Sequence, residues 1–135
     1  MRQNIHSGSP YEALVGYCRA VVQLPFVFVS GTVGRDPDSG DLPDTVEMQC
    51  ANALRTIEIA LRYGGATFAD VVRVTYYAPT RADFEACWPQ LEATFGAHPP
   101  ASTMVVAGLI DPAMRIEIEV TAMVAAVEPA TQPSA

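Results

Sequence analysis

The stretch RIEIEVTAMVA at residues 115–125 decides the fold, because apolar and polar side chains alternate along it. Successive side chains of a β-strand point to opposite faces, so this alternation is typical of a strand with one buried face. The apolar set consists of Ile116, Ile118, Val120, Ala122 and Val124. The opposite set consists of Arg115, Glu117, Glu119 and Thr121. A second face with two glutamates and a threonine predicts a wetted, polar-lined space beside the sheet.

Four further strands are predicted upstream of this one. Runs rich in apolar, β-branched and aromatic residues occur at residues 17–22, 26–29, 71–78 and 102–106. We expect the second run to end at Ser30-Gly31, since glycine adopts backbone conformations that other residues avoid. The segment DPDSG at residues 36–40 predicts a turn, because Pro presets φ, Asp and Ser bond locally, and Gly tolerates positive φ.

A long helix is predicted between the second and third strands. Apolar residues recur at helical spacing from Val46 to Leu61 and form a single stripe. The candidate N-caps are Asp44 and Thr45, whose side-chain oxygens can accept a backbone N–H of the first turn. The helix is expected to end at Gly64-Gly65, which provides the glycine common just after a helix.

A second helix is predicted after the third strand, with Thr80 as its N-cap and an end near Phe95. Pro89 falls inside this segment. A proline within a helix removes one hydrogen bond and clashes with the preceding turn, so we expect a kink or a local break there.

The predicted order of strand, strand, helix, strand, helix, strand, strand is that of an α+β fold. Both helices can bury their apolar stripes against one face of a mixed sheet. The other face must then be covered by water or by another subunit. The length of 135 residues predicts one domain, over residues 1–127. We expect a loose start over residues 1–11 and a disordered tail over residues 128–135.

Composition excludes several classes of function. The formal net charge is −7 and the eight basic residues are scattered, which disfavours nucleic-acid binding. The three cysteines and two histidines lack metal-ligand spacing, so we expect no metal. No apolar run approaches the roughly 18 residues of a membrane span, and no apolar signal region is evident. A cytoplasmic protein with no nucleic-acid or membrane partner is expected.

Several local strings, taken in order, resemble the RidA-like family, also called YjgF or L-PSP. They include Ser30-Gly31, Asp38-Ser39-Gly40 and Asn52-Ala53-Leu54. The strings ADVVRVT at residues 69–75 and RIEIEVTA at residues 115–122 complete the set, and the last is the most specific. The match covers most of the chain.

The resemblance implies a chorismate-mutase-like α+β fold that assembles as a homotrimer with ligand clefts between its subunits. It also implies hydrolysis of a reactive enamine or imine metabolite to a 2-oxo acid and ammonia. Members of the family do this without a metal or an organic cofactor. We therefore expect a small-molecule metabolite as the ligand and no cofactor.

The resemblance places Tyr17, Ser30, Gly31 and Glu117 in the cleft. Tyr17 matches the family's early tyrosine, Ser30-Gly31 matches a backbone contact, and Glu117 matches the glutamate that holds the attacking water. From the residues alone, Glu117 is also consistent with an ordinary solvated strand face. Tyr17 is likewise consistent with a partly buried core or interface aromatic.

The loop after Pro99-Pro100 departs from the family pattern. The resemblance implies an arginine that binds the substrate carboxylate, and this chain has Ala101 there, with Thr103 where a cysteine is common. Losing such an arginine–carboxylate contact weakens the free energy of ligand binding by about 2–5 kcal/mol. Trp88 also stands where many members have a small polar residue, and it is expected to line the cleft. The basic candidates to replace the arginine are Arg73, Arg81 and Arg115.

Three functions remain open on this basis. The first is a deaminase or imine hydrolase, with Glu117 and Tyr17 as its catalytic residues. Its binding residues would be Ser30, Gly31, Trp88, Ala101 and Thr103. The second is a non-catalytic ligand-binding or regulatory trimer that keeps the cleft without the arginine. The third is a ribonuclease, which fits the acidic composition worst.

Overall fold

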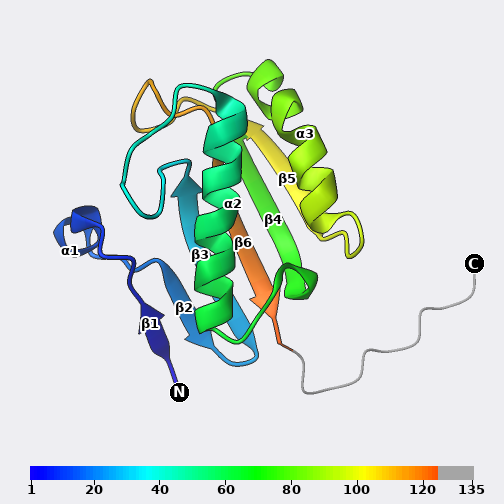
Figure 1. Cartoon of the computed structure of the whole chain (residues 1–135). Coiled ribbons are helices and arrows are strands. Elements are labelled where there is room, and N and C mark those ends of the chain that lie inside the picture. Colours follow the sequence, from blue (N-terminus) through cyan, green and yellow to red (C-terminus); the bar gives the residue numbers. More distant parts are fainter. Residues whose placement is uncertain (125–135) are drawn as a thin grey trace, which may run out of the picture.

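The computed structural model describes residues 1–124, which form a sheet covered on one face by two long helices (Figure 1). This arrangement confirms the predicted α+β fold with a mixed sheet and both helices on the same side. The predicted tail at residues 128–135 and the last residues of the predicted domain lie outside the described residues.

Six strands form the sheet, in the spatial order β1-β2-β3-β6-β4-β5. Their bounds are Gln3–Ile5 (β1), Ala20–Gln23 (β2), Phe26–Val33 (β3), Val71–Ala78 (β4), Ala101–Val106 (β5) and Glu117–Met123 (β6). Neighbouring strands are antiparallel except β4 and β5, which are parallel. A parallel pair needs a crossover connection, and a helix between β4 and β5 supplies it. Strand β6 lies between β3 and β4.

The two covering helices are α2 (Val46–Tyr63) and α3 (Arg81–Phe95), and each begins at a threonine cap. The Thr45 side chain accepts the N–H of Met48, and the Thr80 side chain accepts the N–H of Asp83. Gly65 follows α2 with φ of 79°, the left-handed conformation that ends many helices. The predicted caps are therefore confirmed, with Thr45 in preference to Asp44. A 3₁₀ turn, η1 (Phe68–Asp70), leads into β4.

Helix α3 continues through Pro89, so the predicted local break is wrong. A proline leaves the carbonyl four residues earlier, that of Glu85, without a helical donor. Pro89 is exposed and Glu85 is partly exposed, so water can bond to this carbonyl. Cys87 and Leu91 are buried on the opposite side of the helix, and their packing holds the two flanking turns in place.

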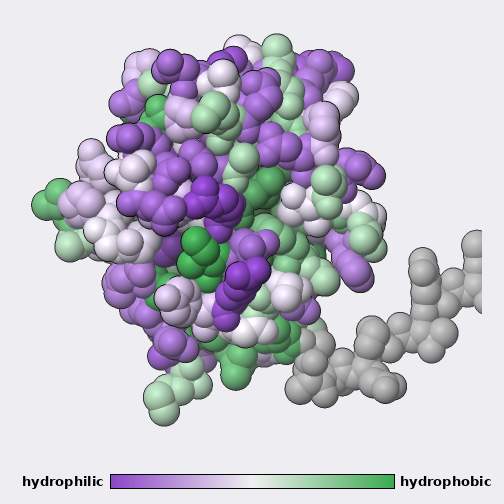
Figure 2. Space-filling view, viewed as in Figure 1, coloured by the Kyte–Doolittle hydropathy of each residue, from purple (hydrophilic) through white to green (hydrophobic). Residues whose placement is uncertain are grey.

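The core lies between the sheet and the helices, and the apolar side of β6 faces it as predicted. Ile116, Ile118 and Ala122 are completely buried, and α2 contributes the equally buried Ile57 and Leu61 to the same cluster. Figure 2 shows the helix-bearing side, where hydrophilic residues occupy much of the surface. The alternation of β6 therefore sends its glutamates to the sheet face that the helices leave open.

A buried glutamine joins α2 to the chain that leads into β6. Gln49 is completely buried, and its Nε2 donates to the carbonyls of Pro43 and Ala113 at 2.8 and 2.9 Å. Its Oε1 accepts the backbone N–H of Arg115 at 2.8 Å. All the polar atoms of this side chain therefore have partners, which is the condition for burying an amide without a large cost.

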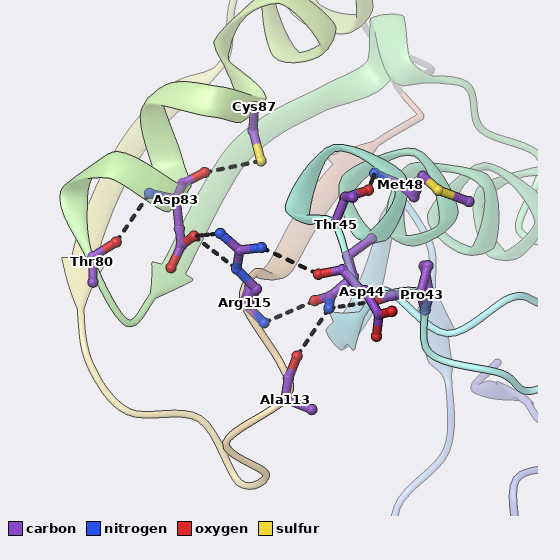
Figure 3. Close-up of polar contacts among 10 residues, drawn as sticks. Pro43, Asp44, Thr45, Met48, Thr80, Asp83, Cys87, Ala113 and Arg115 are labelled. Carbon is purple, nitrogen blue, oxygen red and sulfur yellow. Dashed lines mark hydrogen bonds and ion pairs between the residues drawn. The ribbon is translucent and has the colours of Figure 1, made fainter.

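Arg115 differs from the expectation that its side chain shares the face of Glu117. Strand β6 begins only at Glu117, and the Arg115 guanidinium instead contacts the helix layer (Figure 3). Its Nε and Nη2 donate to the Asp83 carboxylate of α3 at 3.0 and 2.6 Å, and Nη1 donates to the Asp44 carbonyl at 3.2 Å. The chain ahead of β6 therefore ties both helices together.

The start of the chain is ordered where a loose start is predicted. Strand β1 pairs with β2, and a short helix, α1 (Pro10–Val15), follows it. The buried Glu12 carboxylate accepts the N–H of Ser7 and lies 3.2 Å from Nδ1 of His6. The predicted strand at residues 17–22 begins only at Ala20. The pairing of β1 depends on a strand that is distant in the sequence, so local composition does not indicate it.

Gly34 follows β3 at a point of close approach to α2, and a Cβ added there would lie 2.3 Å from the Cα of Gln49. Gly34→Ala is expected to lower the free energy of unfolding by about 3 kcal/mol, because backbone on both sides must move. Gly108→Ala is the matched control, since no atom lies within 4 Å of the added Cβ. Urea unfolding compares the two variants, and equal stabilities would contradict this packing.

Candidate functional site

Strand β3 carries a bulge where it runs beside β6. The register between the two strands shifts between Val29 and Thr32, so Ser30 and Gly31 lie inside β3. The expectation that the strand ends at Ser30-Gly31 is wrong, because Thr32 and Val33 still pair with β6. A bulge bends a strand and re-aims the residues around it, and bulges are common beside active sites.

The polar groups of Ser30 are bound within the chain. Its N–H donates to the Arg19 carbonyl at 3.0 Å, and its hydroxyl donates to the Cys18 carbonyl at 2.8 Å. The Ser30 carbonyl in turn accepts the Thr32 hydroxyl at 2.8 Å. These bonds attach the bulge to the segment before β2, which gives Ser30 a structural role and leaves its hydroxyl engaged.

Glu117 is the first residue of β6, and its carboxylate lies against Gly31. A Cβ on Gly31 would lie 2.7 Å from Oε1 of Glu117, so only a glycine leaves room for the carboxylate in this position. Burial raises the pKa of the Glu117 carboxyl, the positive charge of Arg19 opposes that rise, and Glu119 adds to it. A half-buried carboxylate with a raised pKa is a better proton acceptor than an exposed one.

Arg19 belongs to the same cluster, although it is not among the site residues predicted from the sequence. Its Nη2 donates to the Gly31 carbonyl at 2.5 Å, and its guanidinium carbon lies 5.9 Å from the centre of the Tyr17 ring. Burial lowers the pKa of the Arg19 guanidinium, an effect that Tyr17 and Glu12 oppose. Residues two apart in an extended chain point the same way. That spacing from Tyr17 is the signal that could have identified Arg19.

We call these residues the Glu117 cluster: Tyr17, Arg19, Ser30, Gly31 and Glu117. They come from three segments that meet at one end of the sheet, namely the approach to β2, the β3 bulge and the start of β6. The buried neighbours of Glu117, Ile116 and Ile118, face the helices, so Glu117 itself points to the open face of the sheet. The four sequence-predicted residues of the cluster are thus brought together.

An open hollow of about 410 Å³ borders the cluster on the same face, with Ser30 on its wall. Its polar lining residues are Arg73, Thr75, Glu119 and Thr121. Arg73 donates to the Thr103 hydroxyl at 2.6 Å, and the Tyr77 hydroxyl donates to Glu119 at 2.7 Å. This agrees with the polar-lined space that the alternation of the last strand predicts.

Ala101 and Thr103 lie apart from the Glu117 cluster within one chain. Both belong to β5, which is two strands from β6. Ala101 is opposite Arg73, and Arg73 is opposite Thr121, four residues beyond Glu117 along β6. Four residues of strand span about 13 Å. A single chain therefore holds these predicted cleft residues in two separate places.

Trp88 also lies away from the cluster. It is an exposed residue of α3 and packs edge-on against Phe84, with ring centres 5.9 Å apart. Phe84 packs in turn on Tyr76, which points from β4 into the core beneath the helices. Trp88 is therefore on the helix-bearing side, opposite to Glu117.

The basic residues considered as replacements for the arginine are engaged elsewhere. Arg73 bonds to Thr103, and Arg81 pairs with Glu85 one turn along α3. Arg115 pairs with Asp83, as described above. Among residues 1–124, no group of three or more His, Cys, Asp or Glu side chains could hold a metal ion. No helix of that part of the chain is long and apolar enough to cross a membrane.

The fold and the cluster define a small α+β domain with a carboxylate on its open sheet face, and comparison identifies its family. The family model described as "Endoribonuclease L-PSP" matches residues 8–124. The chain therefore belongs to the L-PSP family, which is also known as the RidA or YjgF family.

Named relatives match over nearly their whole length. A RutC family protein of Haemophilus influenzae is 28% identical, over 91% of this chain and 98% of its own. A 2-iminobutanoate/2-iminopropanoate deaminase of Rattus norvegicus is 29% identical, over 91% of this chain and 90% of its own.

Solved structures of the family agree with the fold. Rv2704 of Mycobacterium tuberculosis, a YjgF/YER057c/UK114 family member, is 38% identical with a TM-score of 0.80, covering 91% of this chain and 99% of its own. The YjgF gene product of E. coli is 25% identical with a TM-score of 0.79, covering 90% of this chain and 98% of its own.

Gly31→Ala is expected to push the Glu117 carboxylate out toward solvent, because the nearest obstacle to the new Cβ is the flexible end of that side chain. Since burial is the largest cause of the raised pKa, its loss should lower the pKa of Glu117 toward that of an ordinary glutamate. Titration followed by the carboxyl ¹³C shift of Glu117 measures this. Gly108→Ala serves as the control, and an unchanged pKa in Gly31→Ala would contradict the contact.

Proposed function

We propose that three copies of the chain pack through their open sheet faces and enclose a small-molecule cleft at each interface. The open face carries Phe26 and Phe28, which are 38% and 43% exposed and stack on each other with ring centres 5.7 Å apart. Val21 and Met123, their partners on the neighbouring strands, extend this apolar area. Contiguous exposed apolar surface of this kind is typical of an interface between subunits.

The separation of the predicted cleft residues supports the same assembly. The Glu117 cluster lies at one place on the sheet, whereas Ala101 and Thr103 lie on the edge strand β5. A contact between the cluster of one copy and β5 of the next would join the two groups in one cleft. Contacts of this head-to-tail type close into a ring, and three copies give the trimer that the family resemblance implies.

For the reaction in this cleft, we propose hydrolysis of a 2-imino acid or its enamine tautomer. Water adds to the carbon of the protonated C=N bond while Glu117 accepts a proton from it, which gives a carbinolamine. Glu117 returns this proton to the nitrogen, the C–N bond breaks, and the hydroxyl proton passes to the departing ammonia, which leaves as ammonium with a 2-oxo acid as the other product. The reaction consumes only water besides the imine. Proton transfer by a well-placed carboxylate contributes about 10²–10⁴-fold to such a rate.

The observation that carries this proposal is the half-buried Glu117 carboxylate against Gly31, with Arg19 beside it. A carboxylate on an ordinary solvated strand face would not need a glycine opposite it. The name of the Rattus norvegicus relative, 2-iminobutanoate/2-iminopropanoate deaminase, supports the same reaction class.

A second candidate is a ligand-binding trimer without turnover. It is favoured by Ala101, which offers no side-chain donor after Pro99-Pro100, and by the Ser30 hydroxyl, which already donates to a backbone carbonyl. Ribonuclease activity, suggested by the family's description, suits a chain of net charge −7 poorly.

Glu117→Gln is expected to reduce the hydrolysis of 2-aminoacrylate, generated in place by a dehydratase, by about 10²–10⁴-fold because the amide cannot accept a proton. Release of the 2-oxo acid above the uncatalysed rate is the measurement. Glu58→Gln, on the helix-bearing side, makes the same chemical change away from the site and should keep the wild-type rate. Full activity in Glu117→Gln would assign proton transfer to another group.

Phe28→Asp is expected to convert the trimer to monomers, since the new charge would be buried at the interface without a partner. Native mass spectrometry or light scattering at micromolar concentration follows the change in mass. Met48→Asp provides a control, because Met48 is 58% exposed in the first turn of α2, where a negative charge is favourable. A wild-type protein that is already monomeric would disprove the proposed assembly.

A further inference from the structure

Arg19 is a half-buried cation that forms no ion pair with a carboxylate among residues 1–124. Its Nε is shielded from solvent and has no hydrogen-bond partner, and its guanidinium donates only to the Gly31 carbonyl. None of the ion pairs found among residues 1–124 includes Arg19. Arg115 differs in this respect, because its guanidinium has the Asp83 carboxylate as a direct partner.

A guanidinium has five N–H donors, and burying it costs free energy unless those donors and the charge are matched. The Gly31 carbonyl accepts one of the five, and the Tyr17 ring lies over the group at 5.9 Å. Among residues 1–124, the other donors of Arg19 have no hydrogen-bond acceptor, and the nearby charges of Glu12 and Glu117 act on the guanidinium without forming an ion pair with it. Arg19 can therefore bind an anion that comes from outside the chain, and two of its donors could contact a carboxylate side by side.

Glu117 places the opposite charge on the other side of Gly31. The Gly31 carbonyl binds Arg19, whereas its Cα faces the Glu117 carboxylate. A ligand in this cluster therefore meets a cation and a carboxylate that are separated by one residue of backbone. This arrangement fits a small molecule whose carboxylate adjoins a nitrogen that can carry a proton.

We propose that Arg19 binds the carboxylate of a small 2-imino or 2-oxo acid, so that the adjacent imine nitrogen or carbonyl lies toward Glu117. The imino-acid part of this inference rests on the proposed function, whereas the binding of a carboxylate does not. Arg19 then supplies the charge that Ala101 lacks, and Ala101 does not exclude a carboxylate substrate.

Arg73 is a second cation on the open face, and it is less suited to this role. Its Nη2 already donates to Thr103 at 2.6 Å, and the residue is exposed. Ion pairs of exposed side chains contribute little, because water screens the charges. Arg73 also lies opposite Thr121, well along β6 from Glu117, so one small ligand would not reach both.

The test compares the binding of two ligands, 2-oxobutanoate and its neutral amide 2-oxobutanamide, to the trimeric protein by calorimetry. Wild type should prefer the carboxylate. Arg19→Gln should weaken the binding of 2-oxobutanoate by on the order of 10–100-fold and leave that of 2-oxobutanamide unchanged. Arg62→Gln removes an arginine from the helix-bearing side and should match wild type for both ligands.

An Arg19→Gln variant that keeps the wild-type preference for the carboxylate would overturn the inference, as would a wild-type trimer that does not bind 2-oxobutanoate. A merely structural role of Arg19 predicts equal loss of both ligands. If Arg19→Gln fails to fold, Arg19→Lys decides. The lysine keeps the charge but lacks the paired donors of a guanidinium. The preference for 2-oxobutanoate over 2-oxobutanamide should therefore fall several-fold, and an unchanged preference contradicts the inference.

These outcomes separate the inference from the proposed reaction. Arg19-dependent binding of 2-oxobutanoate in a protein that does not accelerate imine hydrolysis would reject the reaction and keep the binding role. Hydrolysis that continues in Arg19→Gln with an unchanged KM would reject the role of Arg19 and keep the reaction.

Discussion

Strand β6 sits between β3 and β4, and every second residue of it is buried beneath α2 and α3. This burial fixes the register of the strand, because a slip by one residue would move Ile118 and Val120 into water and Glu117 and Glu119 into the core. Glu117 and Glu119 are therefore held on the open face as a consequence of packing on the other side. The Gln49 and Arg115 contacts strengthen the constraint by anchoring the chain just ahead of the strand.

The bulge in β3 turns this sheet face into a chemical site. Gly31 provides the space for the Glu117 carboxylate, and its carbonyl binds the Arg19 guanidinium. Gly31 thus sets the position of both the Glu117 carboxylate and the Arg19 guanidinium. The partial burial of both groups makes their charges more effective than they would be in water, because the surrounding dielectric is lower. The same burial leaves the Nε of Arg19 without a hydrogen-bond partner among the described residues.

Much of the fold could be predicted because it depends on local patterns. The alternation of β6, the apolar stripe of α2 and the threonine caps each follow from a few neighbouring residues. The predictions from sequence fail where a partner that is distant in the sequence determines the local structure. Strand β1 exists through its pairing with β2, and β3 continues past Gly31 because β6 pairs with its end. Arg19 was missed because its importance comes from the fold, which brings it to Gly31, rather than from a motif.

The central claim is that the open sheet face borders a second chain and that the Glu117 cluster lies in the resulting cleft. A crystal structure of the protein soaked with 2-oxobutanoate tests this most directly. The account predicts three chains around a shared axis, with the ligand's carboxylate on Arg19 and its carbonyl toward Glu117. A structure in which the Glu117 side of β6 faces open solvent, with no second chain nearby, would contradict it.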